Sequence, residues 1–145
     1  MPGLTVEIIT AEHSVLSGEA TMVVAPTTEG VIGILPRHAS LLTTLAPGVM
    51  ILKKEGGSEE SLAVAGGFLE VNHDRVLVLA DTAEREDDID EERAVAARTR
   101  AEEALREAAR HPDAALRAEA ARTALRRSLA RLNVVQRKRR RRPTS

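Results

Sequence analysis

Short apolar runs separated by turn-forming residues recur through the first 80 residues of the chain. Their spacing of roughly ten residues is typical of the strands of a sandwich or barrel. Several runs, such as residues 76–80, are apolar on both faces, so at least part of each strand is expected to be covered on both sides. We therefore predict a compact two-layer β sandwich. The runs are residues 4–9, 20–25, 31–35, 49–52, 61–65, 68–71 and 76–80.

Two groups of turn residues divide the last three runs. Asn72, His73 and Asp74 lie between the final pair, and Asn and Asp tolerate the positive φ of a hairpin turn. Gly66 and Gly67 lie between the preceding pair, which marks a sharp turn or bulge where a side chain would clash. We expect a hairpin at the first group and a bend at the second.

The second half of the chain is rich in Ala, Arg, Glu and Leu, which favour helix. Asp88 is a suitable N-cap, with Glu91 three residues later to return the capping hydrogen bond. The first helix can run to about residue 110, residues 111–113 break it, and a second helix can span about 114–136. A break this short predicts an antiparallel hairpin.

These patterns predict a segregated α+β fold, with a β sandwich over residues 1–84 and a helical hairpin over 85–136. The apolar stripes of the hairpin consist largely of alanine. Burial of a leucine side chain stabilises by about 1.5–3 kcal/mol and a methyl contributes far less, so such a hairpin detaches easily. A mobile hairpin and a permanently docked one are both compatible with this composition.

Composition excludes several kinds of chemistry. The 145 residues are 43% hydrophobic but 1% aromatic, so the single Phe cannot stack successive bases of a nucleic acid. The absence of cysteine excludes disulfides and thiol catalysis. His13, His38 and His73 lie too far apart to form a helical metal pair, and no metal ligands or catalytic residues are expected. No membrane span or cleaved signal is visible, so we expect a soluble cytoplasmic protein.

The net charge of −1 conceals two oppositely charged halves. Residues 1–80 contain four Lys and Arg against nine Asp and Glu, a net −5, whereas residues 81–145 contain seventeen against thirteen, a net +4. Residues 137–145 begin with a run of six cations whose mutual repulsion predicts a disordered tail. An alternative function is therefore nucleic-acid binding through the Arg-rich hairpin and tail.

Three stretches resemble the ATPase epsilon chain family, the epsilon subunits of bacterial F-type ATP synthases, which are called delta in mitochondria. They are residues 29–42, 65–71 and 78–84. The first resembles the family segment E-G-x-x-G-x-x-P-x-H-A-x-L-L, with glycines, proline and histidine in register. The order of a β domain followed by a helical hairpin agrees with this resemblance.

The resemblance implies a non-catalytic rotor subunit of a proton-translocating ATP synthase, peripheral to the cytoplasmic face of a bacterial membrane. The sandwich would lie at the foot of the central stalk, against the gamma subunit and the ring of c subunits. The hairpin would either fold against the sandwich or extend along gamma into the catalytic head of alpha and beta subunits, where it blocks ATP hydrolysis.

The resemblance also implies contact residues. The segment facing the c ring would comprise Gly30, Val31, Ile32 and Gly33, and His38 would face gamma. Val31 stands where family members often carry a second acid. Four basic residues of the second helix would meet acidic surfaces of the beta subunit in the extended state. They are Arg122, Arg126, Arg127 and Arg131.

Residues 89–94 fit the pattern I/L-D-x-x-R-A through which some bacterial epsilon subunits bind ATP. Carboxylates can accept hydrogen bonds from the nucleoside and arginines can clamp phosphates. ATP is thus expected as a regulatory ligand that holds the hairpin closed, and no cofactor is required. In the alternative, Asp90 and Glu91 only cap the helix and Arg93 pairs with a nearby acid. The expected ATP-binding residues are Glu84, Ile89, Asp90, Arg93, Ala94, Arg100, Arg127 and Arg131.

Overall fold

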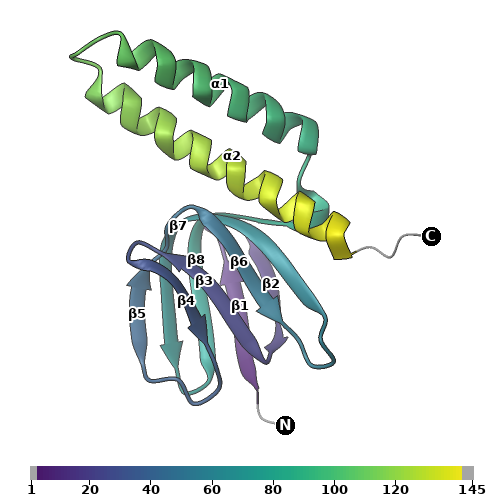
Figure 1. The fold of residues 1–145 in the computed structure, drawn as a ribbon. Coiled ribbons are helices and arrows are strands. Elements are labelled where there is room, and N and C mark those ends of the chain that lie inside the picture. Colours follow the sequence, from purple (N-terminus) through teal and green to yellow (C-terminus); the bar gives the residue numbers. More distant parts are fainter. Residues whose placement is uncertain (1–2, 142–145) are drawn as a thin grey trace.

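A computed structural model of the chain describes residues 3–141 and has eight strands, a short 3₁₀ helix and two long helices (Figure 1). The predicted fold class, a β sandwich followed by a helical hairpin, is confirmed. The strands are β1 (Leu4–Ile9), β2 (Ser14–Ala20), β3 (Met22–Thr27), β4 (Gly30–Ile34), β5 (Leu41–Thr44), β6 (Gly48–Lys53), β7 (Glu59–Asn72) and β8 (Arg75–Arg85). The helices are η1 (Glu86–Asp88), α1 (Glu91–Ala109) and α2 (Ala115–Arg141).

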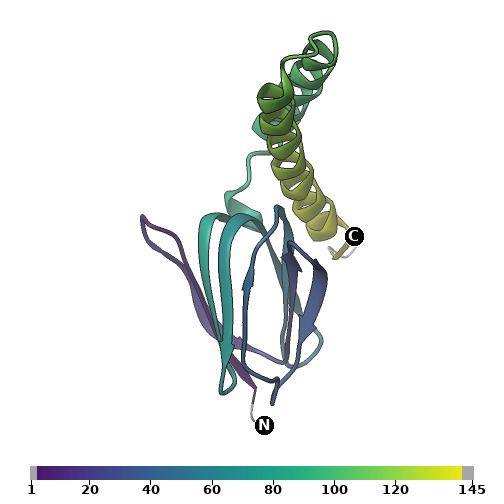
Figure 2. The same cartoon turned by 90° about the vertical axis from the view of Figure 1, so that its left-hand side faces the viewer.

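The sandwich consists of one hydrogen-bonded path of strands that folds over on itself (Figure 2). The order is β2-β1-β8-β7-β6-β3-β4, and β5 also pairs with β7. Strands β1 and β8 are parallel, whereas the other pairs are antiparallel. The first part of β7 pairs with β6 and its last part pairs with β5, so the strand changes its partner on this side along its length.

The change of partner along β7 takes place at its two adjacent glycines. Gly66 and Gly67 have φ angles of +69° and +102°. A Cβ atom on Gly67 would lie 2.0 Å from the backbone oxygen of Leu79 in β8. Only glycine combines this backbone conformation with so close an approach, so the expected clash of a side chain is confirmed, whereas β7 continues through this point without a sharp turn.

The core alternates with an exposed outer face along β7 and β8. Val76 and Val78 point into the core and are almost completely buried. Leu79, in contrast, is 49% exposed and pairs in register with Phe68, which is 55% exposed. The expectation that the run 76–80 is covered on both sides is therefore wrong for this outer face, because no helix of the hairpin packs over it (Figure 1).

Some strands carry too weak a pattern to be found from the sequence. Strand β2 buries only two apolar side chains, Leu16 and Ala20, and β5 buries none completely. The separate runs 61–65 and 68–71 belong to the single strand β7. The hairpin turn at residues 72–74 is confirmed, with His73 and Asp74 at positive φ.

Helix α1 starts later than predicted. Residues 86–88 form the 3₁₀ helix η1, so Asp88 is not the N-cap. Ile89 is extended and packs against the small apolar cluster that joins α2 to the sandwich. Asp90 caps the helix instead, and its Oδ1 accepts a hydrogen bond from the Arg93 backbone N–H at 3.2 Å. Packing of Ile89 thus moves the helix start by two residues.

The two helices form an antiparallel hairpin whose turn includes residues 111–113, as predicted (Figure 1). The predicted end of the second helix at residue 136 is wrong, because α2 continues to Arg141. Four cations of the expected disordered tail form ion pairs with acids near the base of the hairpin, which offsets their mutual repulsion. Cations at a helix C-terminus also interact favourably with the helix dipole. Residues 142–145 of the expected tail lie outside the described residues.

The close approach at Gly67 predicts a large loss of stability on substitution. We expect Gly67→Ala to lower the free energy of unfolding by about 2–4 kcal/mol, since both the φ angle and the backbone contact oppose a Cβ. Urea denaturation measures this loss. Gly57→Ala is the matched control, because Gly57 has φ +90° but a Cβ there would meet no atom within 4 Å. Equal losses in the two variants would contradict the importance of the close approach.

Candidate functional site

A cavity of about 320 Å³ lies where strand β8 leaves the sandwich and the two helices meet. Its wall combines residues from β8, from η1 and the helix cap, from α1 and from α2. The lining residues are Glu84, Asp88, Asp90, Arg93, Ala94, Ala97, Arg100 and Arg131. The cavity is therefore formed jointly by the sandwich and the hairpin.

Most of the expected ATP-binding residues line this cavity. The six that do so are Glu84, Asp90, Arg93, Ala94, Arg100 and Arg131. They come from segments separated by up to 47 positions, and the antiparallel arrangement of α1 and α2 brings them together.

Two expected residues lie elsewhere. Ile89 packs against the cluster of Ala63, Ala130 and Val134 and does not line the cavity. Arg127 is exposed on α2, one turn before Arg131, and does not line it either. The apolar residue of the motif thus anchors the helix start.

Two lining residues, Asp88 and Ala97, were not expected. Ala97 follows Arg93 by four positions and precedes Arg100 by three, so all three lie on one helix face. This spacing could have identified Ala97 from the sequence. Asp88 could not be assigned in that way, because its position depends on the turn of η1.

Two of the three carboxylates that line the cavity, those of Glu84 and Asp90, are already engaged within the protein. Glu84 Oε1 accepts a hydrogen bond from Arg131 Nε at 2.7 Å, and both side chains are partly buried. Asp90 serves as the N-cap of α1, as the alternative interpretation of the motif proposed. These contacts join β8 to α2 and fix the start of α1.

Arg93 and Arg100, the two arginines of α1 that line the cavity, differ from Arg131 in that no carboxylate of the described residues pairs with them. Among residues 3–141, neither Arg93 nor Arg100 forms an ion pair, so the expected alternative pairing of Arg93 with an acid does not occur there. Both side chains are exposed at the cavity. Guanidinium groups in this position can donate paired hydrogen bonds to phosphate oxygens. The volume is at the lower end of the range for small-molecule sites, about 300–1,000 Å³.

The residues expected to face the c ring lie in β4, outside the cavity. Gly30 begins this strand at φ +121°, and Val31, Ile32 and Gly33 follow it. Val31 is exposed, as a contact residue needs to be. His38 lies beyond the strand, partly buried, with its Nδ1 2.6 Å from the Ala39 carbonyl oxygen.

An exposed apolar face on the sandwich was not predicted. It is formed by Leu42 of β5, Phe68 of β7 and Leu79 of β8, which we call the outer apolar face. A cavity of about 420 Å³ adjoins Phe68 and Leu79. The sequence did show apolar residues on both faces of the last strand, but this pattern was interpreted as evidence that both faces are buried. Large exposed apolar residues grouped in this way are typical of protein interfaces.

The four arginines expected to meet the catalytic head do not share one free surface. Arg122 and Arg126 are exposed and pair with Glu119 on the same helix, at 3.4 and 3.5 Å. Arg127 is also exposed, whereas Arg131 is bound to Glu84. Arg131 is therefore engaged by β8 in this structure, unlike the other three arginines.

The described part of the chain, residues 3–141, contains no cluster of three or more potential metal ligands. None of its helices is sufficiently long and apolar to span a membrane.

Comparison with known protein families finds a match for each of the two parts of the chain, the sandwich and the hairpin. The family described as ATP synthase, Delta/Epsilon chain, beta-sandwich domain matches residues 3–86. The family described as ATP synthase, Delta/Epsilon chain, long alpha-helix domain matches residues 87–136.

Relatives agree with this assignment over nearly the full length. The ATP synthase epsilon chain of Moorella thermoacetica is 52% identical over 132 residues, covering 91% of this chain and 96% of the relative. That of Herpetosiphon aurantiacus is 51% identical over 138 residues, covering 95% and 98%. A chain in the structure of the Euglena gracilis mitochondrial ATP synthase, OSCP/F1/c-ring, has the same fold, with a TM-score of 0.77, 23% identity and coverage of 94% and 83%.

The two family matches together span residues 3–136, and each of the two bacterial relatives covers more than nine-tenths of this chain. They include the three stretches that carry the resemblance in the sequence. The chain therefore belongs to the ATP synthase delta/epsilon chain family and is a non-catalytic subunit of that complex, not an enzyme by itself.

Proposed function

We propose that this chain is a regulatory central-stalk subunit of a proton-translocating F-type ATP synthase, peripheral to the cytoplasmic face of a bacterial membrane. Its sandwich connects gamma to the c ring, and its hairpin restrains ATP hydrolysis when it separates and reaches the alpha and beta subunits. Family membership supports the assembly, as does the likeness of its fold to a chain in the Euglena F1/c-ring structure.

One observation carries the regulatory part of this proposal: the cavity has walls from both the sandwich and the hairpin. A ligand in it contacts both parts at once, so it stabilises the docked hairpin and not the separated one. A ligand at 100 times its Kd favours the docked state by about 2.7 kcal/mol. ATP suits the cavity because Arg93 and Arg100 can bind its phosphates.

Arg131 connects the two states of the hairpin. In the docked state it is bound to Glu84 at the cavity. In the separated state it would lose this partner and join the exposed Arg122, Arg126 and Arg127 in binding acidic surfaces of the beta subunit. The same side chain thus belongs to the ligand site in one state and to the inhibitory surface in the other.

The outer apolar face supports gamma binding. Leu42 in β5 follows His38 by four residues, so the expected gamma contact adjoins this face along the chain. Apolar side chains that are exposed in the isolated chain become buried when such a face docks. The nucleic-acid alternative loses support, because four of the basic side chains that it required are bound to acids.

ATP binding is tested by calorimetry on the full chain. We expect Arg93→Ala and Arg100→Ala each to weaken ATP binding at least about tenfold, since a hydrogen bond to a charged group contributes about 1.5–3 kcal/mol. Arg106→Ala, an exposed arginine of α1 that does not line the cavity, should bind as the parent does. Identical affinities in all four proteins would exclude this cavity as the ATP site.

Inhibition is tested in the reconstituted complex. Removal of residues 88–145 should raise the rate of ATP hydrolysis severalfold relative to the complex that contains the full chain, because the inhibitory helices are then absent. Steady-state ATPase assays at matched subunit occupancy measure this. An unchanged rate would show that the hairpin does not inhibit.

Gamma binding is tested at the outer apolar face. Phe68→Lys and Leu79→Lys should each weaken association with gamma at least about tenfold, since burial of a charge at the centre of an interface is unfavourable. Ser58→Lys is the control, because Ser58 is exposed in the turn between β6 and β7, outside this face and outside the hairpin that is expected to extend along gamma. Unaltered co-purification of gamma with the Phe68→Lys and Leu79→Lys variants would place the interface elsewhere.

A further inference from the structure

The contact between α2 and the sandwich is unusually poor in apolar surface. Its buried apolar cluster contains Ala63 of β7 and Ala130 and Val134 of α2, with Val49 and Ile89 packed against it. Side chains of this size contribute little on burial compared with the leucines of a typical core. Apolar packing alone therefore gives the docked hairpin little stability.

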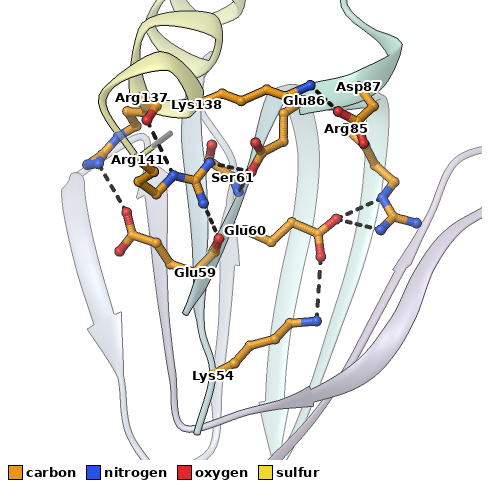
Figure 3. Close-up of polar contacts among 10 residues, drawn as sticks. All are labelled: Lys54, Glu59, Glu60, Ser61, Arg85, Glu86, Asp87, Arg137, Lys138 and Arg141. Atoms are coloured by element: carbon orange, nitrogen blue, oxygen red, sulfur yellow. Dashed lines mark hydrogen bonds and ion pairs between the residues drawn. The ribbon is translucent and has the colours of Figure 1, made fainter. Parts of the chain in front are cut away.

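Four ion pairs add to this apolar contact. The acidic rim consists of four carboxylates at the base of the hairpin: Glu59 of β7, Glu86 and Asp87 of η1, and Glu91 of α1 (Figure 3 shows the first three). The basic end of α2 consists of Arg137, Lys138, Arg139 and Arg141. Arg137 pairs with Glu59 at 3.6 Å and Arg141 with Glu86 at 2.6 Å, while Lys138 pairs with Asp87 and Arg139 with Glu91.

Two members of these ion pairs, Glu86 and Arg141, also form hydrogen bonds with backbone groups of β7. Glu86 Oε1 also accepts a hydrogen bond from the buried Ser61 backbone N–H at 3.0 Å. Arg141 in addition donates to the backbone carbonyl oxygen of Glu59 (Figure 3). The last turn of α2 is thus attached to β7 through main-chain as well as side-chain groups.

We propose that the basic end of α2 and the acidic rim form an ion-pair latch, so that docking of the hairpin depends on ionic strength and not only on a bound ligand. Each pair keeps some solvent exposure, so salt screens it. Screening acts on all four pairs together and also on the Arg131–Glu84 pair that joins α2 to β8, whereas the small apolar cluster is too weak to hold the hairpin by itself. The latch is separate from the candidate ATP cavity and does not require nucleotide.

The test uses the reactivity of a single thiol in the full chain. The chain has no cysteine, so Ala130→Cys places a single small thiol in the docking cluster. When opening is fast and rare, the rate of its reaction with a thiol reagent is proportional to the open fraction. We expect this rate to rise at least about tenfold between about 0.01 and about 1 M salt, over which the Debye length falls from about 30 Å to about 3 Å.

Two matched sets of substitutions distinguish the effect of the latch on the reaction rate from the effect of the total charge. The parent is the Ala130→Cys chain, and every variant carries this change as well. In the latch variant, Arg137, Lys138, Arg139 and Arg141 are each changed to Gln, which keeps helix propensity. The control variant carries the same change at four exposed arginines elsewhere in the hairpin: Arg110, Arg117, Arg122 and Arg126. At low salt, the latch variant should react about tenfold faster than the parent and lose most of its salt dependence, whereas the control should behave as the parent.

A charge exchange tests one pair directly. Arg137→Glu should accelerate the reaction, because it places two carboxylates together, and the additional change Glu59→Arg should restore the parent rate by reversing the pair. Salt-independent labelling of the parent, or equal acceleration in the latch and control variants, would overturn the proposal. So would failure of the exchanged pair to slow the reaction relative to Arg137→Glu alone.

Discussion

The contact between α2 and strands β6 and β7 determines how the two parts of the molecule are held together. It combines a few small apolar side chains with ion pairs that keep some exposure to solvent. Such a contact is specific, because the charges must be in register, but it is not strong. The sandwich has a dense aliphatic core of its own, which is what the proposed release of the hairpin requires if the sandwich is to keep its structure.

The candidate ligand cavity follows from the same arrangement. Its walls exist together only while the hairpin is docked, since Glu84 belongs to β8 and Arg93, Arg100 and Arg131 to the helices. A ligand there and the proposed latch at the end of α2 stabilise one conformation through different chemistry. The first responds to the concentration of the ligand and the second to ionic strength, and the two free energies add when their sites are independent.

Much of this architecture could be predicted from residues close together in the sequence. The turn at residues 72–74, the need for glycine at residues 66 and 67 and the break between the helices depend on local backbone preferences. Of the six expected ATP-binding residues that line the cavity, Asp90, Arg93 and Ala94 lie within the motif, whereas Glu84, Arg100 and Arg131 were expected from the family resemblance and are brought there by the fold. The helix start was wrong by two residues, because packing of Ile89 against the sandwich competes with the capping preference of Asp88.

The sequence by itself determined the two-part fold, since alternating apolar runs and alanine-rich helical segments are local properties. Tertiary structure decided what each charged or apolar side chain does. The basic run 137–141 was expected to be disordered because like charges repel, yet it is helical because acids from β7, η1 and α1 surround it. Leu79 was expected to be covered, yet it is exposed beside Phe68. Electrostatic partners and burial are set by residues distant in sequence, so local patterns cannot supply them.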